Sequence, residues 1–278
     1  MTQALEREFE FRVNDFRFIA SLVHDKTGIV LADHKQDMVY ARIARRLRQL
    51  NMQTFREYCT LLDSELGQEE MGNFVNALTT NLTSFFREMH HFAHLRDHVL
   101  KPLVANPPPD RKIRLWSSAC SSGAEPYSMA MTCYETIPDI ERWDIKILAT
   151  DIDTGMVAKS VTGQYTTNDV EPVPEPLRHK YIVPQNNGHV HMHDKLKSII
   201  SFKQMNLIER WPFKGPFDAV FCRNVIIYFN KETQKTLFAQ MAEKVKPLGW
   251  LYIGHSETLH NVSDRFRLLG KTIYQRIP

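Results

Sequence analysis

Residues 111–128 read RKIRLWSSACSSGAEPYS, a short apolar run followed by a polar turn and the start of a helix. The run Ile113–Ser118 has the β-branched and aromatic character of a strand. Gly123 permits a tight turn close to a ligand, and Pro126 suits the first turn of a helix. A strand, a turn and a helix in this order are typical of the parallel sheets of α/β proteins.

Similar strand patterns recur along the rest of the chain, and loops or helical stretches separate them. They cover Ile145–Thr150, Ile199–Met205, Phe217–Cys222 and Trp250–Gly254. Arg267–Ile277 is expected to form a terminal hairpin with the last of them. We predict a helix over Glu232–Lys246 that Pro247 and Gly249 end. These patterns together predict an α/β fold with a Rossmann-like sheet.

The first quarter of the chain has helical periodicity instead. One helix is predicted from the spacing of Val39, Ile43, Leu47 and Leu50, and others at Asp15–His24 and Phe55–Leu62. Three arginines, Arg42, Arg45 and Arg46, are expected on or near the solvent-facing side of that helix. They form either an ordinary solvated face or a dock for an acidic surface.

Length and composition indicate a globular chain of two domains, with 278 residues of which 43% are hydrophobic and 24% charged. We place a helical domain at 1–78 and a sheet domain at 79–278, with Pro107–Pro109 marking a surface connection between folding units.

The net charge of +3 is too small to indicate nucleic-acid binding. No apolar run approaches the roughly 20 residues of a membrane helix, and the cysteines lack C-x-x-C spacing. We therefore expect a cytoplasmic protein with no nucleic-acid partner and no membrane insertion.

Polar residues follow the predicted strands, where an open parallel sheet binds its ligands. Asp151 follows the second strand, and a carboxylate there can accept hydrogen bonds from ribose hydroxyls. Asn206 and Leu207 follow the third strand, and Arg223 and Asn224 follow the fourth. The first turn lacks the G-x-G-x-x-G pattern of dinucleotide sites. A nucleoside without phosphates, such as S-adenosylmethionine, fits these residues better.

Five motifs in a common order resemble the chemotaxis receptor methyltransferases (CheR), and the resemblance runs from about Asp15 to the C-terminus. They are Asn81–Glu88, Cys120–Ser128, Ala149–Thr154, Phe217–Phe229 and Gly254–Glu257. The resemblance implies an S-adenosylmethionine-dependent methyltransferase sheet, an N-terminal helical domain and a small antiparallel β-subdomain inserted at about 179–202. It also implies methyl transfer to glutamates on the cytoplasmic methylation helices of chemoreceptors, with S-adenosylhomocysteine as the second product.

The resemblance also implies a set of site residues. Cofactor-binding positions of the family match Asn81, Thr83, Arg87, Glu125, Asp151, Asn206, Leu207, Arg223 and Asn224. The attacking glutamate is already ionised at pH 7, since its ordinary pKa is about 4.3, so no general base is expected. The protein must instead supply alignment and a dry site. Phe85, Phe86 and Tyr228 are candidates for that low-polarity surface.

The candidate catalytic residues are Tyr228 and Arg87. The Tyr228 hydroxyl could orient the incoming carboxylate, although an aromatic residue at this position could equally be part of the core. A guanidinium paired to the attacking carboxylate would stabilise the reactant more than the transition state. Arg87 is therefore assigned first to the carboxylate of the cofactor.

Two histidine clusters could place imidazoles on one face of an element. They are His90, His91 and His94, and His189, His191 and His193. No thiolate or carboxylate is evidently arranged beside them, so we predict no metal site.

Two other functions remain open, namely a methyltransferase acting on a small molecule or nucleic acid, and a non-catalytic module that senses S-adenosylmethionine. The arginine cluster favours a protein substrate. The loop Pro184–His189 between two predicted strands is about three residues shorter than in family members that tether themselves to a receptor-tail peptide, which adds a strand there. We therefore predict that this chain does not need a tail tether.

Overall fold

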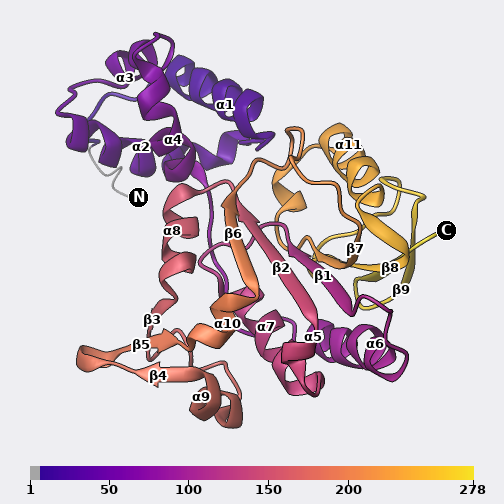
Figure 1. The fold of residues 1–278 in the computed structure, drawn as a ribbon. Helices are drawn as coiled ribbons and strands as arrows, with labels where there is room; N and C mark the ends of the chain where they lie inside the picture. Colours follow the sequence, from indigo (N-terminus) through magenta and orange to yellow (C-terminus); the bar gives the residue numbers. More distant parts are fainter. Residues whose placement is uncertain (1–6) are drawn as a thin grey trace, which may run out of the picture. The chain divides into compact units, whose positions relative to one another are not determined.

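The computed structural model describes residues 7–278, which divide into two compact units. The helical unit contains the residues up to Thr80 together with Tyr228–Asn230, and the sheet unit contains Asn81–Ile227 and Lys231–Pro278. Figure 1 follows the chain through both. Among residues 7–278, no helix has both the length and the apolar character that crossing a membrane requires.

The helical unit confirms the predicted α-helical N-terminal region. Its elements are α1 (Val13–Thr27), a 3-10 turn η1 (Asp33–Lys35), α2 (Gln36–Leu50), α3 (Phe55–Leu62) and α4 (Gly67–Leu78). The apolar stripe of α2 is completely buried at Val39, Ile43 and Leu47, as its spacing predicts.

The sheet unit contains a seven-stranded sheet in the order β6-β2-β1-β7-β8-β10-β9. The strands from β6 to β8 in this order run parallel, and β10 and β9 are added antiparallel as the terminal hairpin. Their bounds are β1 (Lys112–Ser117), β2 (Asp144–Asp151), β6 (Ile200–Gln204), β7 (Phe217–Phe221), β8 (Val245–Tyr252), β9 (Phe266–Gly270) and β10 (Ile273–Arg276). The predicted α/β class is confirmed.

Helices of the sheet unit connect and cover these strands. They are α5 (His90–His94), α6 (Lys101–Ala105), α7 (Ala124–Thr136), α8 (Thr154–Thr162), α9 (Glu175–Tyr181), α10 (Asp194–Ser198) and α11 (Lys231–Ala242). Shorter turns are η2 (Leu95–Leu100, π-helical), η3 (Ile140–Arg142), η4 (Asn186–Gly188) and η5 (Ile226–Tyr228). Helix α7 packs on β1, β2 and β6, and every residue in Ala124–Cys133 is buried. This central helix therefore fixes the turn that precedes it.

The predicted end of the last helix is wrong. Helix α11 ends at Ala242, and Pro247 and Gly249 lie inside β8. The pairing of β7 with β8 shifts register between Phe217 and Ala219, whose partners are Val245 and Trp250. Proline cannot donate a ladder hydrogen bond, and this irregularity removes Pro247 from the regular ladder. The strand therefore starts five residues before the predicted Trp250.

A separate antiparallel sheet has the order β3-β5-β4, with β3 (Gln164–Thr166), β4 (Ile182–Pro184) and β5 (His189–Met192). Figure 1 shows it set apart from the main sheet. It begins before the predicted insertion at about 179–202, because β3 supplies its third strand, whereas Ile200–Phe202 belong to β6. The run Pro107–Pro109 lies inside the sheet unit and not between the two units, so that prediction was wrong.

Candidate functional site

Residues just beyond β1, β2 and β7 lie together, because these parallel strands are adjacent in the sheet. The turn after β1 is fixed by Gly123, which precedes α7 with a φ of 91°. A Cβ there would lie 2.9 Å from the Tyr165 hydroxyl and 3.0 Å from Ser160. Only glycine therefore fits this turn without displacing its neighbours.

Asp151 ends β2 and is 7% exposed. Its Oδ2 accepts a hydrogen bond from the Ser121 backbone N–H (2.7 Å), and its Oδ1 accepts one from the Asp153 N–H (3.0 Å). Burial raises the pKa of Asp151 to about 6, although these backbone donors act in the opposite direction. A carboxylate offers about four lone-pair positions, so Asp151 retains capacity to accept ribose hydroxyls.

Asn81 joins this group from a segment that is distant in sequence. Its Nδ2 donates to Asp153 Oδ2 (2.7 Å), and its carbonyl accepts from the Ser121 hydroxyl (2.7 Å). Asp153 Oδ1 also caps α8 by accepting from the Met156 N–H. Sequence reasoning missed the roles of Ser121 and Asp153, although both lie inside the motifs that carried the resemblance. Their polar character so close to Asp151 was the available signal.

Arg223 and Glu125 form a buried ion pair at the end of β7. Arg223 Nη1 donates to Glu125 Oε2 at 2.9 Å, and the two side chains are 3% and 10% exposed. The Ser117 hydroxyl donates to Glu125 Oε1, and Arg223 Nη2 donates to the Arg87 carbonyl. Burial raises the pKa of Glu125, and Arg223 and Ser117 oppose that rise. Within residues 7–278, Arg223 Nε is buried without a hydrogen-bond partner.

Glu257 organises the loop that contains Asn224, and sequence reasoning gave it no role. It accepts backbone hydrogen bonds from Asn224 and Gly254 through Oε2 and from Ile226 through Oε1. Burial raises the pKa of Glu257, whereas these donors lower it. Asn224 has a φ of 58°, a conformation that this set of hydrogen bonds holds in place. The Gly254–Glu257 motif was the signal for it.

The remaining candidate positions belong to two separate segments, 83–87 and 206–207, and differ in their surroundings. Arg87 is partly buried, and its Nη1 donates to the Leu82 carbonyl. Asn206 accepts from the Ile208 N–H and donates to Glu209, and Leu207 is buried. Thr83 is partly buried. Phe85 and Phe86, predicted to line a dry site, pack into the core against Tyr165 and Phe92.

Tyr228 belongs to the helical unit and is therefore not among the residues that the sheet unit brings together. Its carbonyl accepts a hydrogen bond from the Val30 N–H at 2.8 Å. Burial lowers the pKa of Arg42, and the neighbouring Tyr228 opposes that effect. Tyr228 therefore lies near the guanidinium of Arg42.

The predicted solvent-facing arginine surface is correct only for Arg45, which is exposed. Arg42 is partly buried and donates to the carbonyls of Leu78 and Thr79 at the end of α4. Helix ends leave such carbonyls without intrahelical partners, which explains this contact. Arg46 forms a two-bond ion pair with the buried Glu70, at 2.8 and 2.7 Å. Arg42 and Arg46 therefore stabilise the helical unit.

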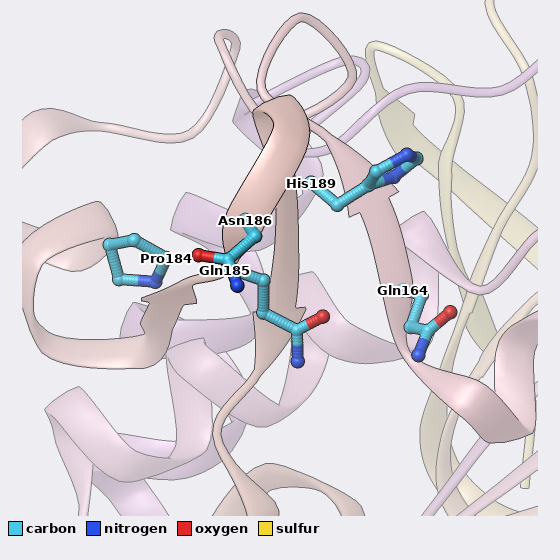
Figure 2. A pocket seen from close by; sticks show the side chains of 5 residues that line it. All are labelled: Gln164, Pro184, Gln185, Asn186 and His189. Carbon is cyan, nitrogen blue, oxygen red and sulfur yellow. The ribbon is translucent and has the colours of Figure 1, made fainter.

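The small sheet contains an open hollow lined by Gln164, Pro184, Gln185, Asn186 and His189 (Figure 2). The turn beside it is tight, since Gln185 N–H donates to the His189 carbonyl and Asn187 has a φ of 62°. This turn belongs to the short loop from which we predict that the chain does not need a tail tether.

The residues that follow the strands of the main sheet fit an adenosyl cofactor with an amino-acid tail. Asp151 has acceptor capacity for ribose hydroxyls, and the orphaned Arg223 Nε–H is a cationic donor suited to a carboxylate. Buried Leu207 adds an apolar surface of the kind that a base requires.

Comparison with known proteins gives two adjacent family matches. Residues 14–79 match "CheR methyltransferase, all-alpha domain", and residues 81–275 match "CheR methyltransferase, SAM binding domain". The chain is 40% identical over 272 residues to "Chemotaxis protein methyltransferase 2" of Pseudomonas aeruginosa, covering 96% of this chain and 95% of that protein. It is 40% identical over 264 residues to "Chemotaxis protein methyltransferase" of Escherichia coli, covering 93% and 89%.

A third relative, "Probable chemotaxis protein methyltransferase" of Rhizobium etli, is 39% identical over 258 residues, covering 91% of this chain and 96% of that protein. The cofactor of the sheet unit is S-adenosylmethionine. On these matches and this geometry, the chain belongs to the CheR methyltransferase family.

Proposed function

We propose that this chain transfers methyl groups from S-adenosylmethionine to glutamate side chains of chemoreceptors, forming glutamyl methyl esters. The observation that carries the proposal is the similarity to chemotaxis protein methyltransferases, which spans 89% to 96% of each of the three relatives. The chain thus has both the cofactor-binding domain and the helical domain of such proteins.

Methyl transfer requires little from the protein beyond alignment of the cofactor methyl group with the attacking glutamate. The cofactor supplies an electrophilic methyl group, and an ionised glutamate attacks it without a general base. We propose that Asp151 and Arg223 hold the ends of the cofactor, and that Asn81, Thr83, Glu125, Asn206, Leu207 and Asn224 complete its site. Arg87 has guanidinium N–H groups beyond the one bound to Leu82, and we assign these to the cofactor carboxylate. Tyr228 is proposed to orient the substrate carboxylate.

A methyl-transfer assay tests this function. The protein is incubated with S-adenosylmethionine carrying a labelled methyl group and with the cytoplasmic fragment of a chemoreceptor. We expect label on the fragment that alkali releases as methanol, because esters hydrolyse there, and none on a fragment whose methylation-helix glutamates are alanine. Label on a small molecule or nucleic acid would favour another methyltransferase. Cofactor binding without any turnover would favour the sensing module.

Charge reversal at Arg45 is expected to slow receptor methylation roughly threefold to tenfold at low salt, because an exposed cation steers an acidic partner toward the enzyme. Arg45 is chosen because, within residues 7–278, its side chain makes no hydrogen bond or ion pair. The measurement compares the initial rates of Arg45→Glu and the parent at low and high salt. The difference should shrink as salt screens the charges.

Arg56→Glu is the matched control, since Arg56 is also exposed but lies on α3. A similar slowing in both variants would reflect overall charge, and an unchanged rate in Arg45→Glu would remove Arg45 from the docking surface. Arg46 is unsuitable for this test, because its loss leaves the buried Glu70 without its cation.

A receptor-tail peptide is expected to show no binding in the micromolar range, while receptor methylation proceeds normally. The hollow beside the small sheet is bordered by the tight turn at Asn186–Gly188, which offers little backbone to receive an added strand. Calorimetric titration of the isolated peptide measures this. Micromolar affinity, or methylation that depends on the tail, would contradict the prediction. A variant with a three-residue insertion that contains glycine, placed after Gly188, tests whether loop length limits peptide binding.

A further inference from the structure

Three potential metal ligands converge where the segment Asn81–Glu88 meets α5. Glu88, His90 and His91 each present a ligand atom, and these atoms lie within 4.8 Å of one another. Glu88 has a φ of 56°, a left-handed conformation that is uncommon for a residue other than glycine. This local fold brings the Glu88 carboxylate against the imidazole of His91, with Oε2 3.5 Å from Nδ1.

The hydrogen bonds of the two imidazoles define which nitrogen is free. His90 Nε2 lies 3.0 Å from the Lys271 carbonyl, and His91 Nε2 lies 3.2 Å from the same oxygen. A carbonyl oxygen only accepts hydrogen bonds, and the Thr272 hydroxyl, 3.1 Å from His91 Nε2, already donates to the Lys271 carbonyl, so both rings carry a proton on Nε2. In its neutral form, each ring then presents Nδ1 as a lone pair. Metal-binding histidines are typically held in this way, with the other ring nitrogen donating to a carbonyl or carboxylate.

The atoms that face each other lack a hydrogen-bond donor. The His91 side chain is 0% exposed and that of Glu88 is 10% exposed. Within residues 7–278, both His91 Nδ1 and Glu88 Oε2 are buried without a hydrogen-bond donor. Two facing acceptors with no donor between them are unfavourable, and only Glu88 is partly compensated, by the charge of Arg223 3.5 Å away.

A divalent cation resolves the same conflict. In a tetrahedral site with ligand bonds of about 2.0–2.1 Å, neighbouring ligand atoms are about 3.4 Å apart. The 3.5 Å between His91 Nδ1 and Glu88 Oε2 matches that spacing. His255 lies beside the cluster and orients Glu88, because its Nδ1 donates to Glu88 Oε1 at 3.1 Å.

Charge is the main opposing factor. Arg223 Nη2 lies 3.5 Å from Glu88 Oε2 and would repel a cation. However, Arg223 is also paired with Glu125 at 2.9 Å, so two carboxylates share one guanidinium. This cluster has a net charge of −1 before a metal enters, which favours a cation over an empty site.

We propose that Glu88, His90 and His91 bind a divalent transition-metal ion, with Zn²⁺ the best match to two imidazoles and one carboxylate. The ion would tie the start of α5 to the Lys271 turn and to the Gly254–Glu257 loop. The expectation of no metal arose because Glu88 was read only as part of a motif, and its left-handed backbone was not foreseeable.

The test is a titration of the full chain, freed of metal by a chelator, with Zn²⁺ by calorimetry and with Co²⁺ by visible absorption. We expect one equivalent to bind, a tetrahedral Co²⁺ spectrum, and an affinity at least tenfold weaker in His90→Gln and Glu88→Gln. His98→Gln is the matched control, since His98 stacks on His94 at 4.3 Å and could bind metal adventitiously. It should leave the affinity unchanged.

Thermal unfolding gives a second reading that does not depend on enzyme activity. Zn²⁺ should raise the melting temperature of the parent but not that of His90→Gln, a variant chosen because His90 is only partly buried whereas His91 is fully buried. No stoichiometric binding, equal affinity in the parent and His90→Gln, or loss of binding only in His98→Gln would each overturn the proposal.

Discussion

Asp151→Asn is expected to weaken binding of S-adenosylhomocysteine roughly a hundredfold, or about 2–3 kcal/mol. The ionised Asp151 is the acceptor proposed for the ribose hydroxyls, and an amide replaces one charged acceptor oxygen with a donor. Calorimetry measures the affinity, and circular dichroism checks the fold. Alanine is a poorer choice, because it would leave the buried Ser121 and Asp153 N–H groups without their acceptor.

The matched control is Asp144→Asn, at the opposite end of the same strand and paired with Arg114. It should bind the ligand as tightly as the parent. Equal affinity of Asp151→Asn and the parent would exclude Asp151 from the cofactor site.

The pH dependence of binding provides an independent check on the same carboxylate. Burial raises the pKa of free Asp151 to about 6, with Asp153 adding to the rise. Affinity should therefore fall as the pH drops through about 6, and Asp151→Asn should lack this step. The pH dependence of folding stability runs in the opposite direction to that of binding. A raised pKa means that this group's contribution to stability is full below its unfolded value of about 3.9 and is lost as pH rises through 6. Binding is expected to offset that cost at neutral pH.

Much of the fold was predictable because it depends on local patterns. Ile113–Ser118 and Phe217–Cys222 have the character of buried parallel strands, and the structure places strands there. The stripe Val39, Ile43 and Leu47 likewise fixed the buried face of α2. Pro247 was misread because proline usually ends a helix, whereas here it occupies an irregular strand.

The partners of charged side chains were much less predictable. Arg46 and Glu70 are 24 positions apart, and Arg223 and Glu125 are 98 apart, so only the tertiary fold brings them together. Arg42 was expected on the surface because helical spacing gives the direction of a side chain but not the neighbouring helix end it meets. The role of Glu257 was unpredictable for the same reason, because its backbone partners include residues more than 30 positions earlier in the chain.

Removing Arg223 is expected to have the largest effect on stability. Arg223→Met should lower the free energy of unfolding by about 3–5 kcal/mol, because it leaves the buried Glu125 without its cation. Urea denaturation measures the loss. The double variant Arg223→Met, Glu125→Gln should recover most of it, since glutamine can still accept from Ser117 without carrying a buried charge.

The two variants should behave differently with pH and with ligand. In Arg223→Met, the pKa of Glu125 rises further, because burial already raises it and the opposing cation is gone. The variant should therefore regain stability as the pH falls and Glu125 becomes protonated, whereas the double variant should show no such gain. Neither should recover cofactor affinity, because both lack the guanidinium proposed to bind the carboxylate of the cofactor. If the double variant were no more stable than Arg223→Met at neutral pH, the loss would come instead from the Arg87 carbonyl or from Glu88, because both variants leave these two groups without Arg223.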